Sequence, residues 1–344
     1  MRALTISAHG GLEQLQYRDD LPAPTLESPH DVLVRVKAAA LNRLDLFMLG
    51  GLPGITITPP WVVGSDGAGV VEAVGSAVTA VKVGDHVVVN PGRSCRQCEY
   101  CTTGDSPLCL YYGIAGEHFP GTLCDQLVVP EWYVAPIPAS IPFTEAAAFP
   151  LATLTAWRML VSRARLKPGE HVLIWGIGGG VALQALQIAK SLGAVTWVTS
   201  GSDEKLERAK ALGADEVVNH AQVDVGKDVR ARTGKRGVDV VIDSVGEKTW
   251  GQSLMALGKR GRLVTCGGTS GPKLEMDVRR LFWNQWTIMG STMGNEEEFA
   301  AATATFAEGK IHAIVDSVHA LADARAAYER LASAAQFGKV VVSL

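Results

Sequence analysis

The sequence lacks an uninterrupted apolar stretch of the length that a membrane-spanning helix needs. The uncharged stretch 46–65 contains three prolines, and the uncharged stretch 172–189 contains four glycines and two glutamines. A lipid-exposed helix needs about 20 largely apolar residues and an unbroken hydrogen-bond ladder. The first ten residues also lack an apolar segment, so we expect no signal peptide, no membrane association and a cytoplasmic protein.

An excess of positive charge is missing as well. The 32 Lys and Arg residues are balanced by 35 Asp and Glu residues, which gives a formal net charge of −3. This charge provides no basic field for nucleic acid, so we expect no nucleic-acid partner. The 344 residues, 47% of them hydrophobic, suffice for two or three domains with buried cores at roughly 100–200 residues per domain.

Cysteine is scarce except in one short segment. Four of the six cysteines follow the spacing C-x2-C-x2-C-x7-C, and they are Cys95, Cys98, Cys101 and Cys109. Four thiolates in so compact a loop suit a tetrahedral structural zinc ion, one per chain, with no open position for chemistry. The alternatives are free thiols or an iron–sulfur cluster, whose bacterial run closes with a three-residue gap and a proline.

The pattern of apolar residues changes along the chain. In residues 1–130, the run 32–38 alternates apolar with charged or small residues, and 70–75 and 85–90 are further short strands separated by glycine turns, so this part is predicted to be β-rich. Residues 145–160 have helical periodicity interrupted by Pro150.

From His171 onward, apolar strands alternate with amphipathic helices. Ser202 and Asn295 are predicted helix N-caps, and Gly193 and Gly213 are predicted to end helices. The expected fold class is α/β, with a doubly wound parallel sheet in this part of the chain.

A glycine-rich turn follows the strand 171–175. Its spacing is Gly176-x-x-Gly179-x-x-Ala182, and Gly180 and Val181 open the next helix. Such a turn lets phosphate oxygens approach backbone amides at a helix N-terminus, and its position between a strand and a helix predicts a dinucleotide site. The alternative is a packing turn that binds nothing.

The acidic residue that normally binds the ribose 2′-hydroxyl of NAD is missing. Ser200 and its neighbours stand where that acid would lie. A carboxylate 4 Å from a 2′-phosphate would cost about 1 kcal/mol in water and about 4 kcal/mol at an effective dielectric constant of 20. Ser200 and Lys205 are therefore predicted to bind the 2′-phosphate of NADPH, although a helix lysine is ordinarily only a solvated charge.

A β-rich start, a four-cysteine loop, an inserted dinucleotide fold and a returning C-terminal segment together resemble the medium-chain dehydrogenase/reductase superfamily over essentially the whole chain. The resemblance implies a GroES-like catalytic domain at 1–152 with a zinc lobe at 92–112. It also implies an NADP-binding Rossmann domain at 153–287 and a return segment at 288–344 that completes the catalytic domain. Homodimers or homotetramers are expected by the same resemblance.

The sequence departs from the zinc-dependent alcohol dehydrogenases of this family at the catalytic metal. The three positions that match their zinc ligands hold Asn42, Ser65 and Leu151. Leucine has no ligand atom, and neutral amide and hydroxyl oxygens are poor substitutes for thiolate and imidazole. The catalytic zinc is predicted to be absent. An unorthodox site is an alternative, and its candidate ligands are Asp66, Glu117 and His118.

The motifs Asn-x-x-Asp at 42–45 and GSDGAG at 64–69 resemble the quinone oxidoreductase branch. That branch reduces quinones or α,β-unsaturated carbonyl compounds with NADPH, so a small-molecule carbonyl or quinone substrate is expected. Asn42 is the predicted donor to the developing enolate oxygen, where one well-placed donor is worth about 3–4 kcal/mol. Asp45 is the second candidate catalytic residue and is expected to orient the loop. The alternative is that Asn42 has only a structural role, in stabilising a turn.

The family pattern also implies residues around the nicotinamide and adenosine. Thr155, Val245 and Gly267 are expected to line the nicotinamide, and His220 is expected near the 2′-phosphoadenosine unless it is an ordinary surface histidine. Two other functions remain open. One is a zinc-dependent alcohol dehydrogenase with an atypical active-site metal, and the other is a non-catalytic NADPH-binding protein.

Overall fold

The chain folds into two compact units. The computed structural model describes residues 1–344. The first unit combines Met1–Leu154 with Gly294–Leu344, and the second unit is the intervening segment Thr155–Met293. The second unit is therefore an insertion in the sequence of the first.

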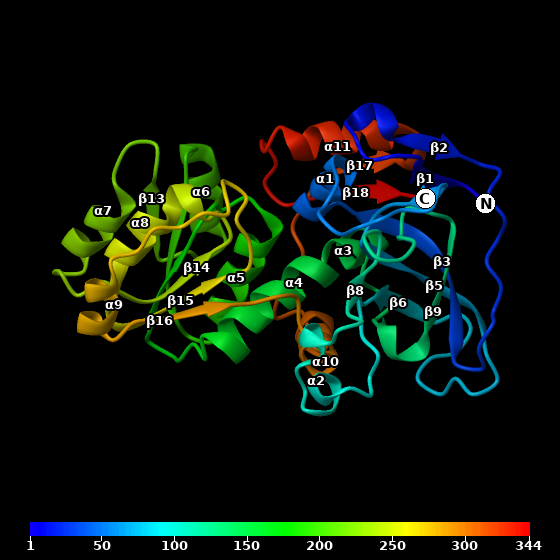
Figure 1. The fold of residues 1–344 in the computed structure, drawn as a ribbon, viewed down its shortest axis with the longest axis horizontal. Helices are drawn as coiled ribbons and strands as arrows, with labels where there is room; N and C mark the ends of the chain where they lie inside the picture. The colour runs from blue at the N-terminus through cyan, green and yellow to red at the C-terminus, as the bar shows by residue number, and fades with distance from the viewer. The chain divides into compact units, whose positions relative to one another are not determined.

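The largest sheet of the first unit has seven strands (Figure 1). Six of them follow the order β10-β6-β5-β3-β18-β17, and β9 also pairs with β3. Their bounds are β3 (Asp31–Ala40), β5 (Asp66–Val74), β6 (His86–Val89), β9 (Gln126–Pro130), β10 (Val134–Pro136), β17 (Val315–Ala320) and β18 (Lys339–Ser343).

Short strands accompany this sheet. A second sheet has the order β2-β1-β4, and β7 pairs with β8, one strand preceding and the other following the four cysteines in the sequence. Their bounds are β1 (Ala3–Ile6), β2 (Gln16–Arg18), β4 (Trp61–Val62), β7 (Gly92–Arg93) and β8 (Gly113–Ile114).

The alternating run at 32–38 lies within β3, as predicted. Val32, Val34 and Val36 are buried, whereas Arg35 and Lys37 are exposed. The alternation arises because successive side chains of a strand point to opposite faces of the sheet. This strand anchors the site described below, since the chain leaves β3 immediately before Asn42.

The last strand returns to β3 from the far end of the sequence. β18 is antiparallel to β3, with Val341 opposite Ala40, and it is parallel to β17. The backbone N–H of Leu41 donates to the carbonyl of Val340 over 2.9 Å. Lys339, which begins β18, is thereby brought to the residues that follow β3.

The helices of the first unit are short, and α1 packs against α11. The bounds are α1 (Arg43–Gly50), α2 (Glu99–Thr102), α3 (Phe143–Ala148), α10 (Glu296–Ala307) and α11 (Ala324–Ala332). Asn295 caps α10 as predicted, because its side chain accepts a hydrogen bond from the backbone N–H of Glu298.

The helical region expected at 145–160 is divided more than the periodicity indicates. α3 ends at Ala148, α4 (Pro150–Trp157) begins at the proline, and residues Arg158–Arg163 form a π-helical turn. Proline lacks the N–H that would continue a preceding helix, but it is well suited to a first helical turn. The π turn has no signal in the apolar pattern.

The second unit is built on one six-stranded parallel sheet (Figure 1). Its order is β13-β12-β11-β14-β15-β16. The strands are β11 (His171–Ile174), β12 (Val195–Ser200), β13 (Glu216–Asn219), β14 (Val238–Asp243), β15 (Leu257–Thr265) and β16 (Thr287–Gly290).

Helices connect these strands. They are α5 (Gly180–Ser191), α6 (Asp203–Ala211), α7 (Val225–Arg232), α8 (Glu247–Ala256) and α9 (Val278–Asn284). Counted within the unit, the strand order is 3-2-1-4-5-6, which confirms the expected doubly wound sheet. Its order reverses between β11 and β14, and ligands of such sheets bind outside the carboxyl ends of the strands at this reversal.

The predicted N-cap of α6 and the predicted C-terminal ends of α5 and α6 are also present. The side chain of Ser202 accepts a hydrogen bond from the backbone N–H of Lys205 and so caps α6. Gly193 and Gly213 follow the two helices with φ angles of 75° and 92°, a conformation that favours glycine. None of the helices in the structure combines the length and the apolar character needed to cross a membrane.

Candidate active site

Asn42 lies at the start of α1, directly after β3. Its backbone N–H donates to Oδ2 of Asp45 over 2.6 Å, and the backbone N–H of Asp45 donates to the carbonyl of Asn42 over 3.0 Å. Asparagine followed three residues later by an acid is a sequence pattern that starts helices. The carboxyl of Asp45 therefore holds the backbone at Asn42.

The side chain of Asn42 belongs to a buried polar cluster. Its Nδ2 donates to Oδ2 of Asp66 over 2.8 Å, and Nζ of Lys339 donates both to Oδ1 of Asn42 and, over 2.8 Å, to Oδ2 of Asp66. Asn42, Asp66 and Lys339 are 8%, 0% and 5% exposed. We call these three side chains the Asn–Asp–Lys cluster.

Sequence reasoning named Asn42 and considered Asp66, but it missed Lys339. Lys339 lies 297 positions from Asn42 and 273 positions from Asp66. Only the pairing of β18 with β3 brings the lysine to the cluster. The sole available signal was the implication that the C-terminal segment returns to the first domain.

The residues at the other two positions that match zinc ligands also make hydrogen bonds within the protein. The backbone N–H of Leu151 donates to Oδ1 of Asp66 over 2.7 Å, and Oγ of Ser65 donates to the carbonyl of Ala115 over 2.8 Å. A dication near Asp66 would face the ammonium of Lys339, with one carboxylate as its only strong ligand. These residues do not fit a tetrahedral zinc site.

The unorthodox metal site considered for Asp66, Glu117 and His118 does not form. Across the chain, only the four-cysteine group brings three or more Cys, His, Asp or Glu ligand atoms together in a metal-binding arrangement. Nδ1 of His118 instead accepts a hydrogen bond from the backbone N–H of Ile114.

Asp45 is buried beside the cluster, with 4% of its surface exposed. Burial raises the pKa of its carboxyl to about 7, although the N–H of Asn42 and the charge of Lys339 oppose this shift. Tyr328 on α11 is fully buried near Asp45, and its hydroxyl has no hydrogen-bond partner in the structure. Burial raises the pKa of Tyr328 well above its usual value, so the phenol is neutral. Phe47 of α1 is 41% exposed.

The predicted dinucleotide turn lies at the carboxyl end of β11 in the second unit. Gly176 has a φ angle of 74°, and its N–H donates to Oγ1 of Thr199. Gly179 caps α5 with an ordinary φ of −79°, and a Cβ added there would meet only the carbonyl of Gly176, at 3.6 Å. The protein itself therefore leaves the position beside the Cα of Gly179 open, as a phosphate-binding turn requires.

The other predicted cofactor residues of the second unit follow successive strands of the parallel sheet. From β11 through β15 they are Gly176, Gly179, Gly180 and Val181 after β11, Ser200 and Lys205 at and after β12, His220 after β13, Val245 after β14, and Gly267 after β15. The carboxyl ends of parallel strands share one edge, so the structure collects these residues at one edge of the sheet. Thr155 lies in α4, buried, with its Oγ1 3.9 Å from Sδ of Met293.

Ser200 and His220 lie side by side at this edge. The backbone N–H of His220 donates to the carbonyl of Ser200 over 3.0 Å, and a Cβ on Gly201 would lie 3.2 Å from Nε2 of His220. Partial burial lowers the pKa of His220 and so favours the neutral form of its ring. The carbonyl of Val245, in contrast, accepts hydrogen bonds from the N–H and hydroxyl of Ser270 within its own loop.

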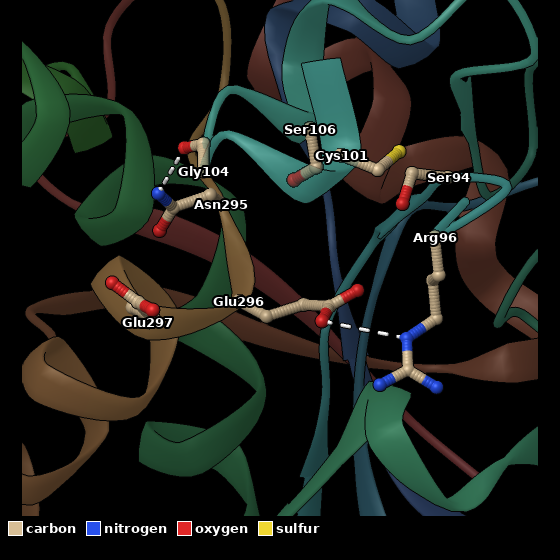
Figure 2. A pocket seen from close by; sticks show the side chains of 8 residues that line it. All are labelled: Ser94, Arg96, Cys101, Gly104, Ser106, Asn295, Glu296 and Glu297. Atoms are coloured by element: carbon tan, nitrogen blue, oxygen red, sulfur yellow. Dashed lines mark hydrogen bonds and ion pairs between the residues drawn. The ribbon is translucent and has the colours of Figure 1, made fainter. Parts of the chain in front are cut away.

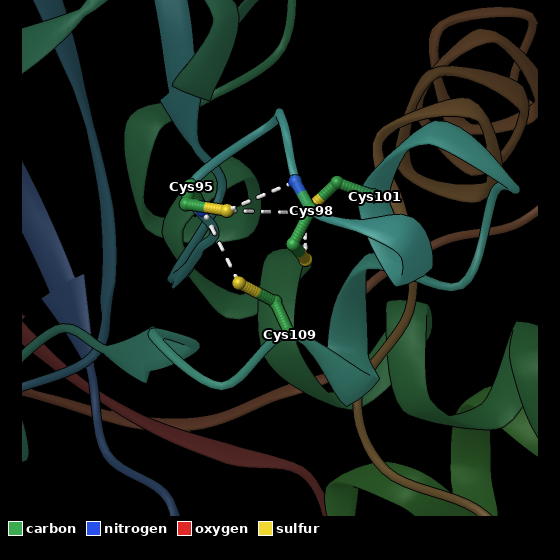
Figure 3. A group of neighbouring side chains, drawn as sticks. All are labelled: Cys95, Cys98, Cys101 and Cys109. Carbon is green, nitrogen blue, oxygen red and sulfur yellow. Dashed lines mark hydrogen bonds between the residues drawn. The ribbon is translucent and has the colours of Figure 1, made fainter.

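The four cysteines of the first unit lie together in a group that could hold a metal ion (Figure 3). Their ligand atoms all lie within 4.8 Å of one another, with Cys98 and Cys101 Sγ atoms 3.5 Å apart and Cys95 and Cys101 Sγ atoms 3.9 Å apart. Sulfurs about 2.3 Å from a tetrahedral zinc ion lie about 3.8 Å from each other. The backbone N–H groups of Cys95 and Tyr111 donate to Sγ of Cys109, and the backbone N–H of Cys98 donates to Sγ of Cys95. The arrangement fits zinc and leaves no open position.

A polar pocket separates this cysteine-rich segment from the start of α10 (Figure 2). Nδ2 of Asn295 donates a hydrogen bond to the carbonyl of Gly104. Nε of Arg96 lies 3.6 Å from Oε2 of Glu296, and Cζ of Arg96 lies 4.3 Å from the centre of the Trp132 ring. These contacts join the cysteine-rich segment to α10. The pocket contains none of the predicted catalytic or cofactor residues.

Comparisons with known proteins agree with this architecture. The profile of the alcohol dehydrogenase GroES-like domain matches residues 28–139, and that of the zinc-binding dehydrogenases matches residues 180–308. The chain belongs to the medium-chain dehydrogenase/reductase superfamily, whose members are oxidoreductases.

Individual relatives differ in their named activities. A quinone oxidoreductase of Pseudomonas aeruginosa is 33% identical over 99% of both chains. The crystal structure of an NAD-dependent alcohol dehydrogenase covers all of both chains with 42% identity and a TM-score of 0.96. The 2-octenoyl-CoA carboxylase reductase CinF, solved with NADP and 2-octenoyl-CoA, has 30% identity and a TM-score of 0.90 over 99% of this chain and 87% of its own.

Proposed function

We propose that this protein is an NADPH-dependent reductase of α,β-unsaturated carbonyl compounds or quinones that works without a catalytic zinc ion. The observation that carries the proposal is the Asn–Asp–Lys cluster. In this cluster Asn42 stands at one of the positions that match the zinc ligands of alcohol dehydrogenases, and Asp66 accepts the backbone N–H of Leu151, which stands at another. A cluster held by an ammonium and an amide supplies hydrogen-bond donors where a metal would supply a Lewis acid.

The chemistry needs a donor near the substrate oxygen. NADPH, when bound, supplies the hydride that the β-carbon of the enone receives. Negative charge then develops on the carbonyl oxygen, and the amide of Asn42 donates a hydrogen bond to that oxygen. Solvent delivers the proton to the α-carbon, which balances the reduction. Asp45 orients the loop that carries Asn42.

The cofactor assignment rests on the edge of the parallel sheet in the second unit, a Rossmann domain in this proposal. The glycine turn would hold the pyrophosphate, and Ser200, Lys205 and His220 would bind the 2′-phosphoadenosine. No acid lies at the end of β12, where it would repel that phosphate. The relatives named above include both an NAD-dependent enzyme and one solved with NADP. The preference for NADPH over NADH is therefore inferred from the residues at the end of β12.

A combined activity and metal measurement tests the proposal. Purified protein is screened for NADPH oxidation with enones, enoyl thioesters, quinones and aldehydes, and the zinc content is measured on the same sample. We expect turnover of an enone or quinone with one zinc ion per chain. Two zinc ions together with chelator-sensitive alcohol oxidation would support a zinc-dependent alcohol dehydrogenase instead, and tight NADPH binding without any turnover would support a non-catalytic protein.

A further inference from the structure

The amide of Asn42 has a defined direction because of its two charged neighbours. An ammonium group only donates hydrogen bonds, so Lys339 must face Oδ1 of the amide. A carboxylate only accepts them, so Asp66 must face Nδ2. With Nζ also bonded to Oδ2 of Asp66, the three side chains form a closed ring of hydrogen bonds.

Turning the amide over would break this ring. Nδ2 would then point its hydrogens at the ammonium, and Oδ1 would face the carboxylate oxygen. Two charge-assisted hydrogen bonds would be replaced by two repulsive contacts in a buried place, where such contacts are poorly screened.

Asp66 and Lys339 are themselves held from other elements. Oδ1 of Asp66 accepts the backbone N–H of Leu151, so both of its oxygens are fixed. Lys339 begins β18, whose pairing with β3 sets its backbone position. The ring of hydrogen bonds therefore fixes the orientation of the Asn42 amide relative to the sheet.

One hydrogen of Nδ2 is bound to Asp66, which leaves the second N–H of the amide for another acceptor. A carbonyl or enolate oxygen is an acceptor of the kind this N–H suits. An amide free to turn would present Oδ1 part of the time, and Oδ1 repels such an oxygen.

We propose that Lys339 is a positioning residue that, together with Asp66, fixes the amide of Asn42 so that Nδ2 and not Oδ1 is presented to the substrate oxygen. This inference rests on the proposed function for its catalytic consequence. The orientation of the amide, however, is measurable without any activity.

The main test is the double variant Asp66→Asn/Lys339→Met. It removes both charges together, so neither side chain is left as an unpaired buried ion. The amide that replaces the carboxylate can present an N–H donor toward Asn42, which favours the turned amide. We expect kcat to fall by about 10-fold or more, below the 10²–10³-fold that loss of a whole oxyanion donor costs, while the KM for NADPH stays unchanged.

A mutant cycle separates positioning from general structural damage. In an Asn42→Ala background the same double variant is expected to change kcat by less than about 2-fold, because no amide remains to be oriented. The control variant Asp316→Asn/Arg330→Met removes an ion pair between β17 and α11 elsewhere in the first unit, and we expect wild-type kcat. Equal losses of kcat in the wild-type and Asn42→Ala backgrounds, or no loss in either, would overturn the proposal.

A spectroscopic readout covers the case in which the proposed function fails. The side-chain amide signals of Asn42 in a ¹⁵N-labelled sample are assigned by their loss in Asn42→Ala. In the wild type we expect one Nδ2 proton to be shifted and protected from exchange by the carboxylate, and we expect this protection to disappear in the double variant. Protection without any enone or quinone turnover would refute the proposed function and leave the positioning intact, whereas amide signals unchanged by the double variant would refute the positioning.

Discussion

Nζ of Lys339 lies 2.8 Å from Oδ2 of Asp66, and the two side chains are 5% and 0% exposed. Removing two charges from water is costly, so a buried ion pair is not in itself a source of stability. The pair instead fixes the orientation of the Asn42 amide, because Lys339 donates to its Oδ1 and Asp66 accepts from its Nδ2.

Breaking the pair on one side should destabilise the first unit strongly. We expect Lys339→Met to lower the free energy of unfolding by about 3–5 kcal/mol, since Asp66 remains as an unpaired buried charge. Asp66→Asn/Lys339→Met should be much closer to the wild type. Thermal melting midpoints of both variants check this, and an equally unstable double variant would contradict it.

Asn42→Ala should damage catalysis and spare cofactor binding. Loss of one oxyanion donor costs about 10²–10³ in kcat, and Asn42 has no predicted contact with NADPH. Steady-state kinetics on the best enone, with a fluorescence titration of NADPH, measures both quantities. Unchanged turnover would remove Asn42 from the mechanism. Asn284→Ala, which alters an asparagine on α9 that donates to the carbonyl of Arg280, is the matched control.

Asp45 should make stability depend on pH with a definite sign. Its pKa is about 7 in the folded protein against 3.8 for the ordinary group, so the folded state binds the extra proton. The stability that this proton provides is therefore complete below pH 3.8 and is lost as the pH rises to about 7. Asp45→Asn should stabilise the protein more at pH 8 than at pH 5, by a few kcal/mol at roughly 1.4 kcal/mol per unit of pKa.

Urea unfolding at the two pH values checks this sign. Asp316→Asn is a control of opposite direction, because the hydrogen bond from Arg330 lowers the pKa of Asp316. Its substitution should destabilise the protein at pH 8, and this effect should shrink as the pH falls toward about 3, where an ordinary carboxyl takes up its proton. A pH-independent effect of Asp45→Asn would refute the raised pKa.

The cysteine-rich segment should contain one zinc ion and need it for order. We expect Cys98→Ser to lower the zinc content below one per chain and to make residues 92–112 sensitive to protease. Cys124→Ser, which changes a buried thiol outside the group, should leave the zinc content at one. Metal analysis and limited proteolysis provide the measurements. A zinc-free wild type that resists protease would argue against a structural metal.

Cofactor preference should respond to charge at the end of β12. Ser200→Asp places a carboxylate near the expected 2′-phosphate and should cost about 1–4 kcal/mol of NADPH binding, with little effect on NADH. Lys205→Met should weaken NADPH selectively, and Lys210→Met on the same helix should not. Specificity constants for the two cofactors measure this preference, and a wild type that prefers NADH would refute it.

Local signals in the sequence predicted much of the fold. The alternation in β3 and the caps at Ser202 and Asn295 appear where the residues indicate, because each depends on neighbours a few positions away. The glycine turn is predictable for the same reason. The π turn after α4 is not, since a π turn does not alter the apolar pattern that marks a helix.

The candidate site was predictable only in part. Asn42 stands in a short motif, but its partner Lys339 is 297 positions away and reaches it through strand pairing. The burial of Asp45 arises in a similar way, because α11 packs against α1 and brings Tyr328 close to the carboxyl. No local pattern in residues 42–45 contains that information.

The pairing of β18 with β3 also determines when the site comes into existence during synthesis. Asn42 leaves the ribosome 297 residues before Lys339, and the second unit, whose strands come from one continuous segment, is translated between them. A nascent chain can thus complete its parallel sheet while β3 still has an open edge and Asp66 still lacks its cation. Because Lys339 begins β18, a growing or truncated chain has no complete Asn–Asp–Lys cluster until β18 is in place.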